Sequence, residues 1–232
     1  MKKILLLLFL LPVLTYAQKK LSGIGKLQIG ASSKVMDTIA KAADVEIGKA
    51  AYFSQTSGDY KHNYNYKTTK IVLLQPGIDS VDWVDYNYMD VPGASVYYLN
   101  YYEHNGLPLE QAYAYFYNDK LYRLEGKVST KLVDGLTALY GKGTTTNLST
   151  HLPCTDSDGQ KQVLWNQMFK TKWPSPTGIG IEYDHGYYYS SNCNGQELNN
   201  LKIQHLKIAG TVLDIALKRK REREQQQATK GK

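Results

Sequence analysis

The chain has 232 residues, of which 42% are hydrophobic, and a formal net charge of +7. Two lysines near the N-terminus and the segment 218–232, which holds seven basic and two acidic residues, account for that charge, so the body between them is close to neutral. A net positive charge that is confined to the two ends of the chain does not indicate a nucleic-acid partner. The body of about 200 residues has no Pro/Gly/Ser linker and is long enough for one large domain or two small modules.

The first 18 residues have the pattern of a secretory signal peptide. Two lysines precede an apolar run at residues 4–14, and a small residue, Ala17, stands before Gln18. The pattern predicts cleavage between Ala17 and Gln18, which leaves 1–17 as signal peptide and 18–217 as the body. The apolar run is too short to cross a bilayer comfortably and no other run is long enough. We therefore expect an exported protein, periplasmic or secreted, with no transmembrane segment.

The first half of the body has the pattern of one helix followed by several strands. Residues 32–43 predict an amphipathic helix with Ser32 or Ser33 as its N-cap. Its apolar stripe consists of Val35, Met36, Ile39, Ala42 and Ala43. A polar stretch at 54–69 indicates a loop. Apolar and alternating patterns predict strands at 70–75, 80–86, 95–102, 111–117 and 120–126.

The last two of these strands form a hairpin whose register decides which side chains face the core. A three-residue turn at 118–120 places Phe116 opposite Tyr122 and Ala114 opposite Leu124. A two-residue turn would pair Arg123 with Ala114 and place its charged side chain among the core positions. The three-residue turn is therefore favoured. The core face then carries Ala112, Ala114, Phe116, Tyr122 and Leu124. The outer face carries Tyr113, Tyr115, Tyr117, Leu121, Arg123 and Glu125.

The second half repeats the order of helix and then strands. A helix is predicted to begin at Ser129 or Thr130 and to end at Gly141, with an apolar face of Leu132, Val133, Leu136, Leu139 and Tyr140. Strands are predicted at 161–173, 178–184, 186–191 and 201–208. The sequence therefore predicts an α+β fold in which helices pack on one face of antiparallel sheets. It also suggests a tandem duplication, with units of about 27–126 and 127–210, supported by the similar stretches 100–106 and 181–186.

Cys154 and Cys193 are the two cysteines of the chain, and both lie in turn-like sequence. An even, minimal count in an exported protein predicts one disulfide that joins two loops. The stretch Asp156–Gly159 has the first residues of a calcium loop but lacks the distal ligands, because the twelfth position is Gln167. It is therefore interpreted as an Asp-Gly turn between strands.

The C-terminal end predicts a charged helix that continues past the body. Apolar residues at 212–217 precede Lys218/Glu222 and Lys220/Glu224, which are spaced for i,i+4 pairing. The basic polar tail, 218–232, also leaves open a weak contact with anionic surfaces.

Two short stretches resemble known exported modules. Residues 27–42, "LQIGASSKVMDTIAKA", are similar to the opening of SmpA/OmlA and β-lactamase-inhibitor-protein modules of the bacterial envelope. "FYNDKLYRLEG" followed by "LTALYGKG" resembles a hairpin and helix end found in exported bacterial proteins. The chain departs from the pattern at Gly143, where a proline would follow, and it lacks a lipid-attachment cysteine. The resemblance implies an α+β fold and a partner-binding envelope role, and it brings no catalytic residues.

The residues that could carry chemistry form no recognisable catalytic motif. The five histidines have no close metal spacing, and we expect neither a metal nor a cofactor. Glu103/His104 and Asp184/His185 are adjacent pairs that a duplication could bring together as an acid-base site. They define the alternative hypothesis, a small secreted hydrolase.

Tyrosine is the anomaly of the composition, with twenty residues against four phenylalanines. Tyrosine suits strands and presents a flat ring with a polar tip, which can stack on a sugar or anchor a protein interface. The leading hypothesis is a non-enzymatic exported protein that binds a protein or glycan through a tyrosine-rich sheet face. The candidate ligand-binding residues, expected to be exposed, are Tyr98, Tyr102, Tyr113, Tyr115, Tyr117 and Arg123.

Overall fold

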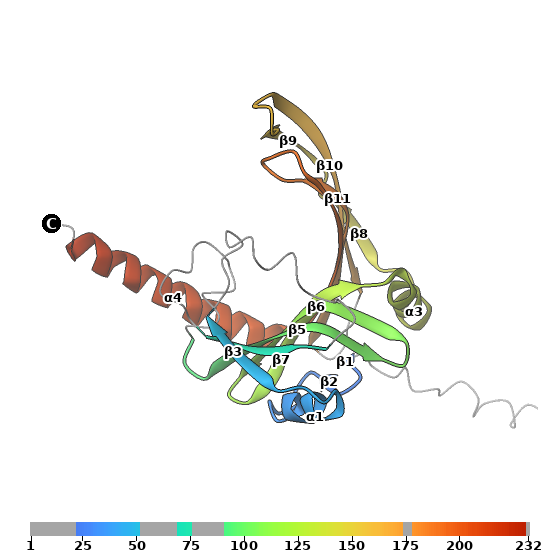
Figure 1. Cartoon of the computed structure of the whole chain (residues 1–232), viewed down its shortest axis with the longest axis vertical. Helices are drawn as coiled ribbons and strands as arrows, with labels where there is room; N and C mark the ends of the chain where they lie inside the picture. Colours follow the sequence, from blue (N-terminus) through green and yellow to red (C-terminus); the bar gives the residue numbers. More distant parts are fainter. Residues whose placement is uncertain (1–21, 52–68, 76–90, 174–177, 231–232) are drawn as a thin grey trace, which may run out of the picture.

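The computed structural model describes residues 22–51, 69–75, 91–173 and 178–230 (Figure 1). The predicted α+β class is confirmed: the described chain is mostly sheet, with helices α1 (Val35–Ala42), α3 (Thr130–Tyr140) and α4 (Leu206–Lys230). The predicted signal peptide, nearly all of the predicted loop 54–69 and the predicted strand 80–86 lie outside the described residues. The strands are β1 (Gly23–Ile24), β2 (Leu27–Gln28), β3 (Ile47–Ala51), β4 (Ile71–Gln75), β5 (Ala94–His104), β6 (Leu107–Tyr117), β7 (Lys120–Val128), β8 (Thr144–Asn147), β9 (Thr150–Thr155), β10 (Lys161–Trp173), β11 (Ile179–Tyr189) and β12 (Gly195–His205).

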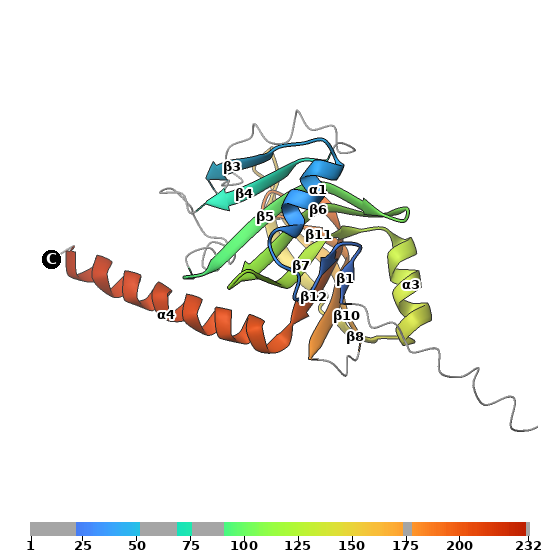
Figure 2. The same cartoon turned by 90° about the horizontal axis from the view of Figure 1, so that it is seen from below.

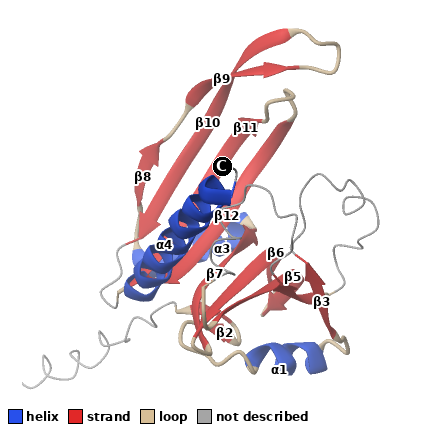
Figure 3. Cartoon of the chain, turned by 90° about the vertical axis from the view of Figure 1, so that its left-hand side faces the viewer, coloured by secondary structure: helices blue, strands red, loops and turns tan. Residues whose placement is uncertain are grey.

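Within the described residues, both halves of the chain contribute to a single ten-stranded sheet. Its order is β3-β4-β5-β6-β7-β12-β11-β10-β8, and β9 pairs with the N-terminal part of β10. The pairing of β3 with β4 is parallel and the other pairings are antiparallel. The last strand of each half, β7 and β12, join the two halves at the middle of the sheet. The far parts of β9–β12 extend away from the helices and the body as a curved, thin arm (Figures 1 and 3).

Two hydrophobic cores lie on opposite faces of the sheet. The first core packs α1 and α3 against one face and contains Met36, Leu99, Phe116 and Leu136 among its buried residues. The second core lies under α4 on the other face, with Val96, Tyr115, Tyr122, Val212 and Ala216 at its centre. Figure 2 shows α4 leaving the body after this contact, so its basic end projects from the fold. The i,i+4 pairs Lys218/Glu222 and Lys220/Glu224 form as predicted, at 3.9 Å and 4.0 Å.

The start of α1 is held by the turn of the β6–β7 hairpin. The predicted N-cap, Ser32 or Ser33, is wrong: Lys34 is the N-cap residue and no side chain caps the helix. The hydroxyls of Ser32 and Ser33 instead donate to the carboxylate of Asp119, which also accepts from the Ser33 amide at 3.0 Å. These hydrogen bonds lower the pKa of Asp119 from 3.8 to about 2. The predicted stripe is wrong at its end, because Ala42 is exposed and Ala40 is buried.

The β6–β7 hairpin has a two-residue turn, so the predicted three-residue turn is wrong. Tyr117 pairs with Lys120, and Asn118 and Asp119 both have positive φ, as a type I′ turn requires. A β-bulge then shifts the register: Phe116 pairs with Leu121, while Tyr115 pairs with Arg123. Ala114 still lies opposite Leu124, as predicted. The bulge exchanges two residues between faces, so that Leu121 enters the first core and Tyr122 the second.

The second helix is close to its prediction. Ser129 is the N-cap residue by position, although its side chain makes no capping hydrogen bond, and Gly141 ends the helix with φ 77°. The carbonyl of Gly141 accepts a hydrogen bond from the Trp173 indole at 3.1 Å, which ties the helix end to the sheet. The sequence did not predict strands β1, β2, β3, β8 and β9. The predicted strands 178–184 and 186–191 are one strand, and the predicted strand 201–208 ends at His205, just before α4 begins.

Candidate functional site: an aromatic face of the extended arm

The arm carries a row of aromatic side chains on one of its two faces, buried at its inner end and exposed at its outer end. Side chains alternate along a strand, and the register places the odd-numbered residues of β9, β10, β11 and β12 on the same face as the first core. The residues of this row, called the aromatic face below, are His151, Trp165, Phe169, Tyr183, His185, Tyr187 and Tyr189. The row begins next to the buried Trp173 and runs outward toward the tip of the arm.

The inner part of the aromatic face is a stack of three rings. His185 stacks on Tyr183 with centroids 4.8 Å apart and on Phe169 at 5.5 Å. His185 Nε2 and Thr171 Oγ1 lie within hydrogen-bond distance, 3.2 Å. Burial in this stack lowers the pKa of His185, against the opposing attraction of Asp184. The Tyr183 hydroxyl donates to Asn199 Oδ1 at 2.8 Å, so the inner rings are fixed in position.

The outer part of the aromatic face presents its rings to solvent. Trp165 is 44% exposed and lies 4.5 Å from the ring of His151 on the neighbouring strand. Tyr187 is 43% exposed and makes an edge contact with Tyr189 at 5.3 Å. The end of the Tyr187 ring lies over Gly195 on β12, where a Cβ would come within 2.0 Å of the tyrosine hydroxyl. Glycine at 195 is therefore what allows this ring to lie across the neighbouring strand.

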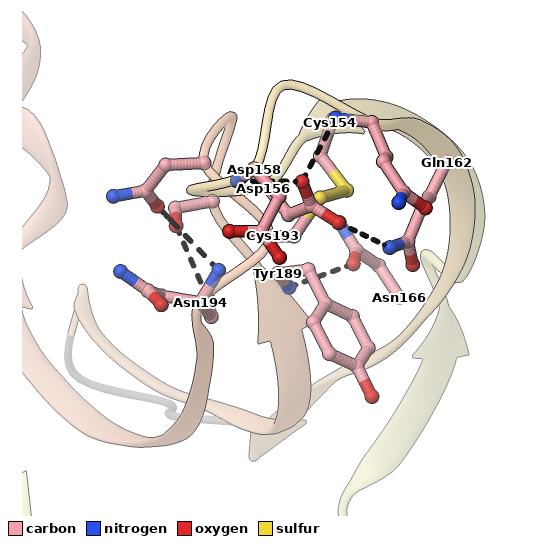
Figure 4. Close-up of a disulfide and its surroundings, with 11 residues drawn as sticks. Cys154, Asp156, Asp158, Gln162, Asn166, Tyr189, Cys193 and Asn194 are labelled. Carbon is pink, nitrogen blue, oxygen red and sulfur yellow. Dashed lines mark hydrogen bonds between the residues drawn. A yellow bond between two sulfur atoms is a disulfide. The ribbon is translucent and has the colours of Figure 1, made fainter.

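The tip of the arm is fastened by the predicted disulfide. Cys154 at the end of β9 is bonded to Cys193 in the β11–β12 turn, with Cα atoms 5.2 Å apart (Figure 4). The Asp156 carboxylate accepts hydrogen bonds from the amides of Asp158 and Gln160, which confirms the predicted Asp-Gly turn. Asn166 Oδ1 accepts from the Tyr189 amide at 2.8 Å, which connects β10 to the outer end of β11. The outer rings therefore stand on a cross-linked support.

The opposite face of the arm carries most of its charges and one tyrosine of β11, Tyr188. The Glu182 carboxylate binds Lys202 at 2.7 Å, Lys172 at 3.1 Å and Lys170 at 3.7 Å, and Lys170 also reaches Asp184 at 3.3 Å. Burial alone raises the pKa of Glu182, but the hydrogen bonds and attraction of the lysines outweigh it and hold the pKa at about 2.

These charges belong to one cross-strand row that joins both halves of the sheet. The register aligns Lys172, Glu182, Lys202, Glu125 and Tyr113 side by side on β10, β11, β12, β7 and β6. We call this row the charge ladder. The charges along the row alternate in sign from Lys172 to Glu125, and the row ends at the uncharged Tyr113. Each charged residue therefore lies beside an opposite charge on a neighbouring strand.

The six tyrosine and arginine residues predicted to bind a ligand do not form one exposed surface. Tyr115 is fully buried in the second core, where its hydroxyl donates to Glu125 Oε1 at 2.6 Å. Arg123 is bonded to the same carboxylate, and its guanidinium lies over the Tyr115 ring at 4.7 Å. Tyr102 is buried on the opposite face and accepts a hydrogen bond from the Lys26 amide.

The other three predicted ligand-binding tyrosines, Tyr98, Tyr113 and Tyr117, are half-buried and pack against the second core. The prediction that the six residues form one exposed surface is therefore wrong, because α4 and the second core cover the sheet face that was expected to be exposed.

The residues of the alternative hydrolase are not brought together. His104 lies at the end of β5 and His185 in the middle of β11, with β6, β7 and β12 between them. Four strand spacings separate the two strands by roughly 19 Å. Glu103 accepts from Tyr101 on its own strand, and Asp184 binds Lys170. The expected convergence of the two acid-histidine pairs is wrong.

Trp165, His151 and Tyr187 were not selected from the sequence. The signal was available in "KQVLWNQMFKTKW", where the three aromatic residues, Trp165, Phe169 and Trp173, fall on odd positions, although the apolar Leu164 and Met168 fall on even ones. Four of the twenty tyrosines fall in 183–189, of which three are consecutive, and this run was interpreted only as strand.

Comparison with known proteins gives no relative from which a role could be transferred: no family model, no curated protein and no solved structure matches the chain. Among the described residues, no helix is long and apolar enough to cross a membrane. No group of three or more His, Cys, Asp or Glu side chains in the described ranges is arranged to hold a metal ion.

Proposed function

We propose that the protein is an exported, non-enzymatic binding protein whose partner contacts the aromatic face of the arm. The observation that carries this proposal is the exposure of Trp165 and Tyr187, two large rings that belong to neither core. Val163, on the same face and 65% exposed, enlarges the apolar surface. Adjacent exposed rings on one face are typical of a surface that a partner covers.

The support of the rings favours binding. The disulfide, the Asn166 hydrogen bond to Tyr189 and the inner ring stack fix the strands that carry Trp165 and Tyr187. A surface fixed before binding loses little conformational entropy when the partner arrives.

Export is part of the proposal, with residues 1–17 as the signal peptide and a periplasmic or extracellular location. The disulfide suits an oxidising compartment. Mass spectrometry of protein secreted by the producing cells tests this directly, since cleavage after Ala17 leaves Gln18 as the first residue.

A tandem duplication, related to small envelope modules of the SmpA/OmlA and β-lactamase-inhibitor-protein type, is the proposed origin of the fold. Each half of the described chain runs from a helix into strands, and each ends in an antiparallel meander, β5–β6–β7 and β10–β11–β12. The meanders meet at β7 and β12, and α1 and α3 both pack in the first core. The similar stretches 100–106 and 181–186 do not contribute, because one ends a strand and the other lies in mid-strand.

A weak contact of the C-terminal helix with anionic envelope surfaces is a further part of the proposal. The projecting end of α4 holds Lys218, Lys220 and Arg221 on exposed positions, while the body is close to neutral. Such a contact would fall away at high salt because exposed charges are screened.

Binding by the aromatic face is tested with two adjacent tyrosines that point to opposite faces. Tyr187 lies on the aromatic face, whereas Tyr188 lies on the charged face and bonds to Gln196. The mature protein is mixed with envelope fractions of the producing organism, and the co-sedimenting fraction is measured. We expect Tyr187→Ala and Trp165→Ala to reduce binding about tenfold or more, and Tyr188→Ala to leave it unchanged. Equal binding by all three variants and the parent protein would refute the proposal.

A further inference from the structure

We infer that the ligand of the aromatic face is an uncharged glycan chain that lies along β11, an inference that rests on the proposed function. Three observations carry it: the pairing of rings with amides, the separation of charge between the two faces, and the size of the surface.

Rings on the aromatic face stand next to side-chain amides. The register places Gln167 beside Tyr187, Asn199 beside His185 and Asn147 beside Phe169. Asn199 is already bonded to Tyr183 through Oδ1 and to Glu197 through Nδ2, and Asn147 Oδ1 accepts from the Ser149 amide, so these two side chains offer a sugar hydroxyl their remaining N–H donors. An aromatic ring suits the C–H face of a sugar. Sugar rings stacked along β11 would meet both kinds of group at successive positions.

Charge is almost confined to the opposite face of the arm. Lys170, Lys172, Lys202, Glu182 and Asp184 lie there and are paired with one another. On the aromatic face, the charged residues at odd positions of the arm strands are Lys161 and Glu197, and the Glu197 carboxylate accepts a hydrogen bond from Asn199. A surface without net charge gives no electrostatic advantage to an anionic or cationic ligand.

The surface is too small for a stable protein partner. Tyr183 is buried, so the accessible length of β11 runs from His185 to Tyr189, a rise of about 13 Å, and the four strands β9, β10, β11 and β12 give about 15–20 Å of width. That area is a fraction of the roughly 800 Å² that each partner buries in a standard protein interface. A short oligosaccharide segment fits the length and needs no larger area.

The orientation of Tyr187 adds a specific platform. Because Gly195 has no side chain, the end of the tyrosine ring lies across β12. A methyl group at 195 would collide with that ring and lift it. Gly195→Ala therefore removes the platform without removing any aromatic residue.

The test titrates the mature protein with soluble, neutral tetra- to hexasaccharides of glucose, xylose, mannose and N-acetylglucosamine by calorimetry. We expect binding of at least one series, weakened about tenfold or more by Trp165→Ala, Tyr187→Ala and Gly195→Ala. Tyr188→Ala is the matched control and should bind as the parent does. The affinity should change little between about 10 and about 150 mM salt, because no charge pairs form. Circular dichroism of each variant shows whether the fold is kept, and Trp165→Phe, which retains a ring, should keep most of the binding.

Two outcomes separate this inference from the proposed function. If neutral sugars do not bind while envelope binding still depends on Trp165, the aromatic face binds something else and the inference is overturned. Protease treatment of the envelope fraction that removes the binding, with periodate oxidation having no effect, would identify a protein partner and overturn it as well. If neither sugars nor envelope fractions respond to Trp165 and Tyr187, both proposals fail together.

Discussion

Glu182 is the member of the charge ladder with three lysine partners, and its removal should destabilise the sheet. Its side chain is 14% exposed and lies within 4 Å of three lysine ammonium groups. Glu182→Gln keeps the shape of the residue but leaves Lys170, Lys172 and Lys202 facing one another. Lys170 and Lys202 are 27% and 21% exposed, so without Glu182 they stay partly desolvated and lose an opposite charge, whereas water screens Lys172, which is 58% exposed.

The magnitude follows from the pKa. The pKa of Glu182 falls from 4.5 to about 2, and each unit corresponds to about 1.4 kcal/mol, so about 3 kcal/mol is the upper bound on what the ionised form contributes, and screening at the exposed Lys172 lowers it. Since the folded pKa is the lower one, this contribution is fully present above about pH 4.5 and is lost as the pH falls toward 2. In a chain of this size that upper bound corresponds to a Tm lower by at most about 6–12 °C.

The assay is urea unfolding and thermal melting of the mature protein from pH 7 down to pH 2. Glu182→Gln should lower the free energy of unfolding at pH 7 and remove much of the decline that the parent protein shows below pH 4.5. Glu222→Gln is the control, because the exposed Lys218–Glu222 pair should contribute less than about 1 kcal/mol. If Glu182→Gln melts within the error of the parent, or if its stability declines with acid as steeply as the parent's, the ladder does not stabilise the sheet as argued.

Two more predictions concern the sheet and the arm. Gly126→Ala should destabilise the protein by about 1–3 kcal/mol in urea unfolding, because the new Cβ would lie 2.9 Å from Cα and Cβ of Ala112 in the first core. Gly135→Ala, whose Cβ meets open space on α3, should stabilise by up to about 1 kcal/mol, and a loss at both positions would contradict this distinction. Replacing Cys154 and Cys193 by serine should lower the free energy of unfolding by about 3–4 kcal/mol in the loop-entropy model. It should also speed amide hydrogen exchange in the β11–β12 turn. Unchanged exchange there would show that the tip of the arm keeps its structure without the disulfide.

Local patterns were enough to predict much of the secondary structure. The helices at α1 and α3, the long strands and the charged C-terminal helix follow from apolar periodicity and turn residues, which act within a few residues of one another. The disulfide followed from the count of cysteines and the signal-like N-terminus. Strands β8 and β9 escaped because "TTTN" and "THLPCT" are short and polar and form as partners of β10.

The sequence determined that this protein is an α+β domain with one disulfide, a charged terminal helix and many tyrosines on strands. Only the tertiary structure decided which tyrosines reach the surface. Tyr115 is buried because α4 and the second core lie over its face, and a β-bulge sends Tyr122 to the same side. Tyr187 stays exposed because the arm carrying it extends past α1 and α3, and Gly195 lets the end of its ring lie across β12. Alternation along a strand assigns a residue to one of two faces, but what covers each face depends on segments far away in the chain.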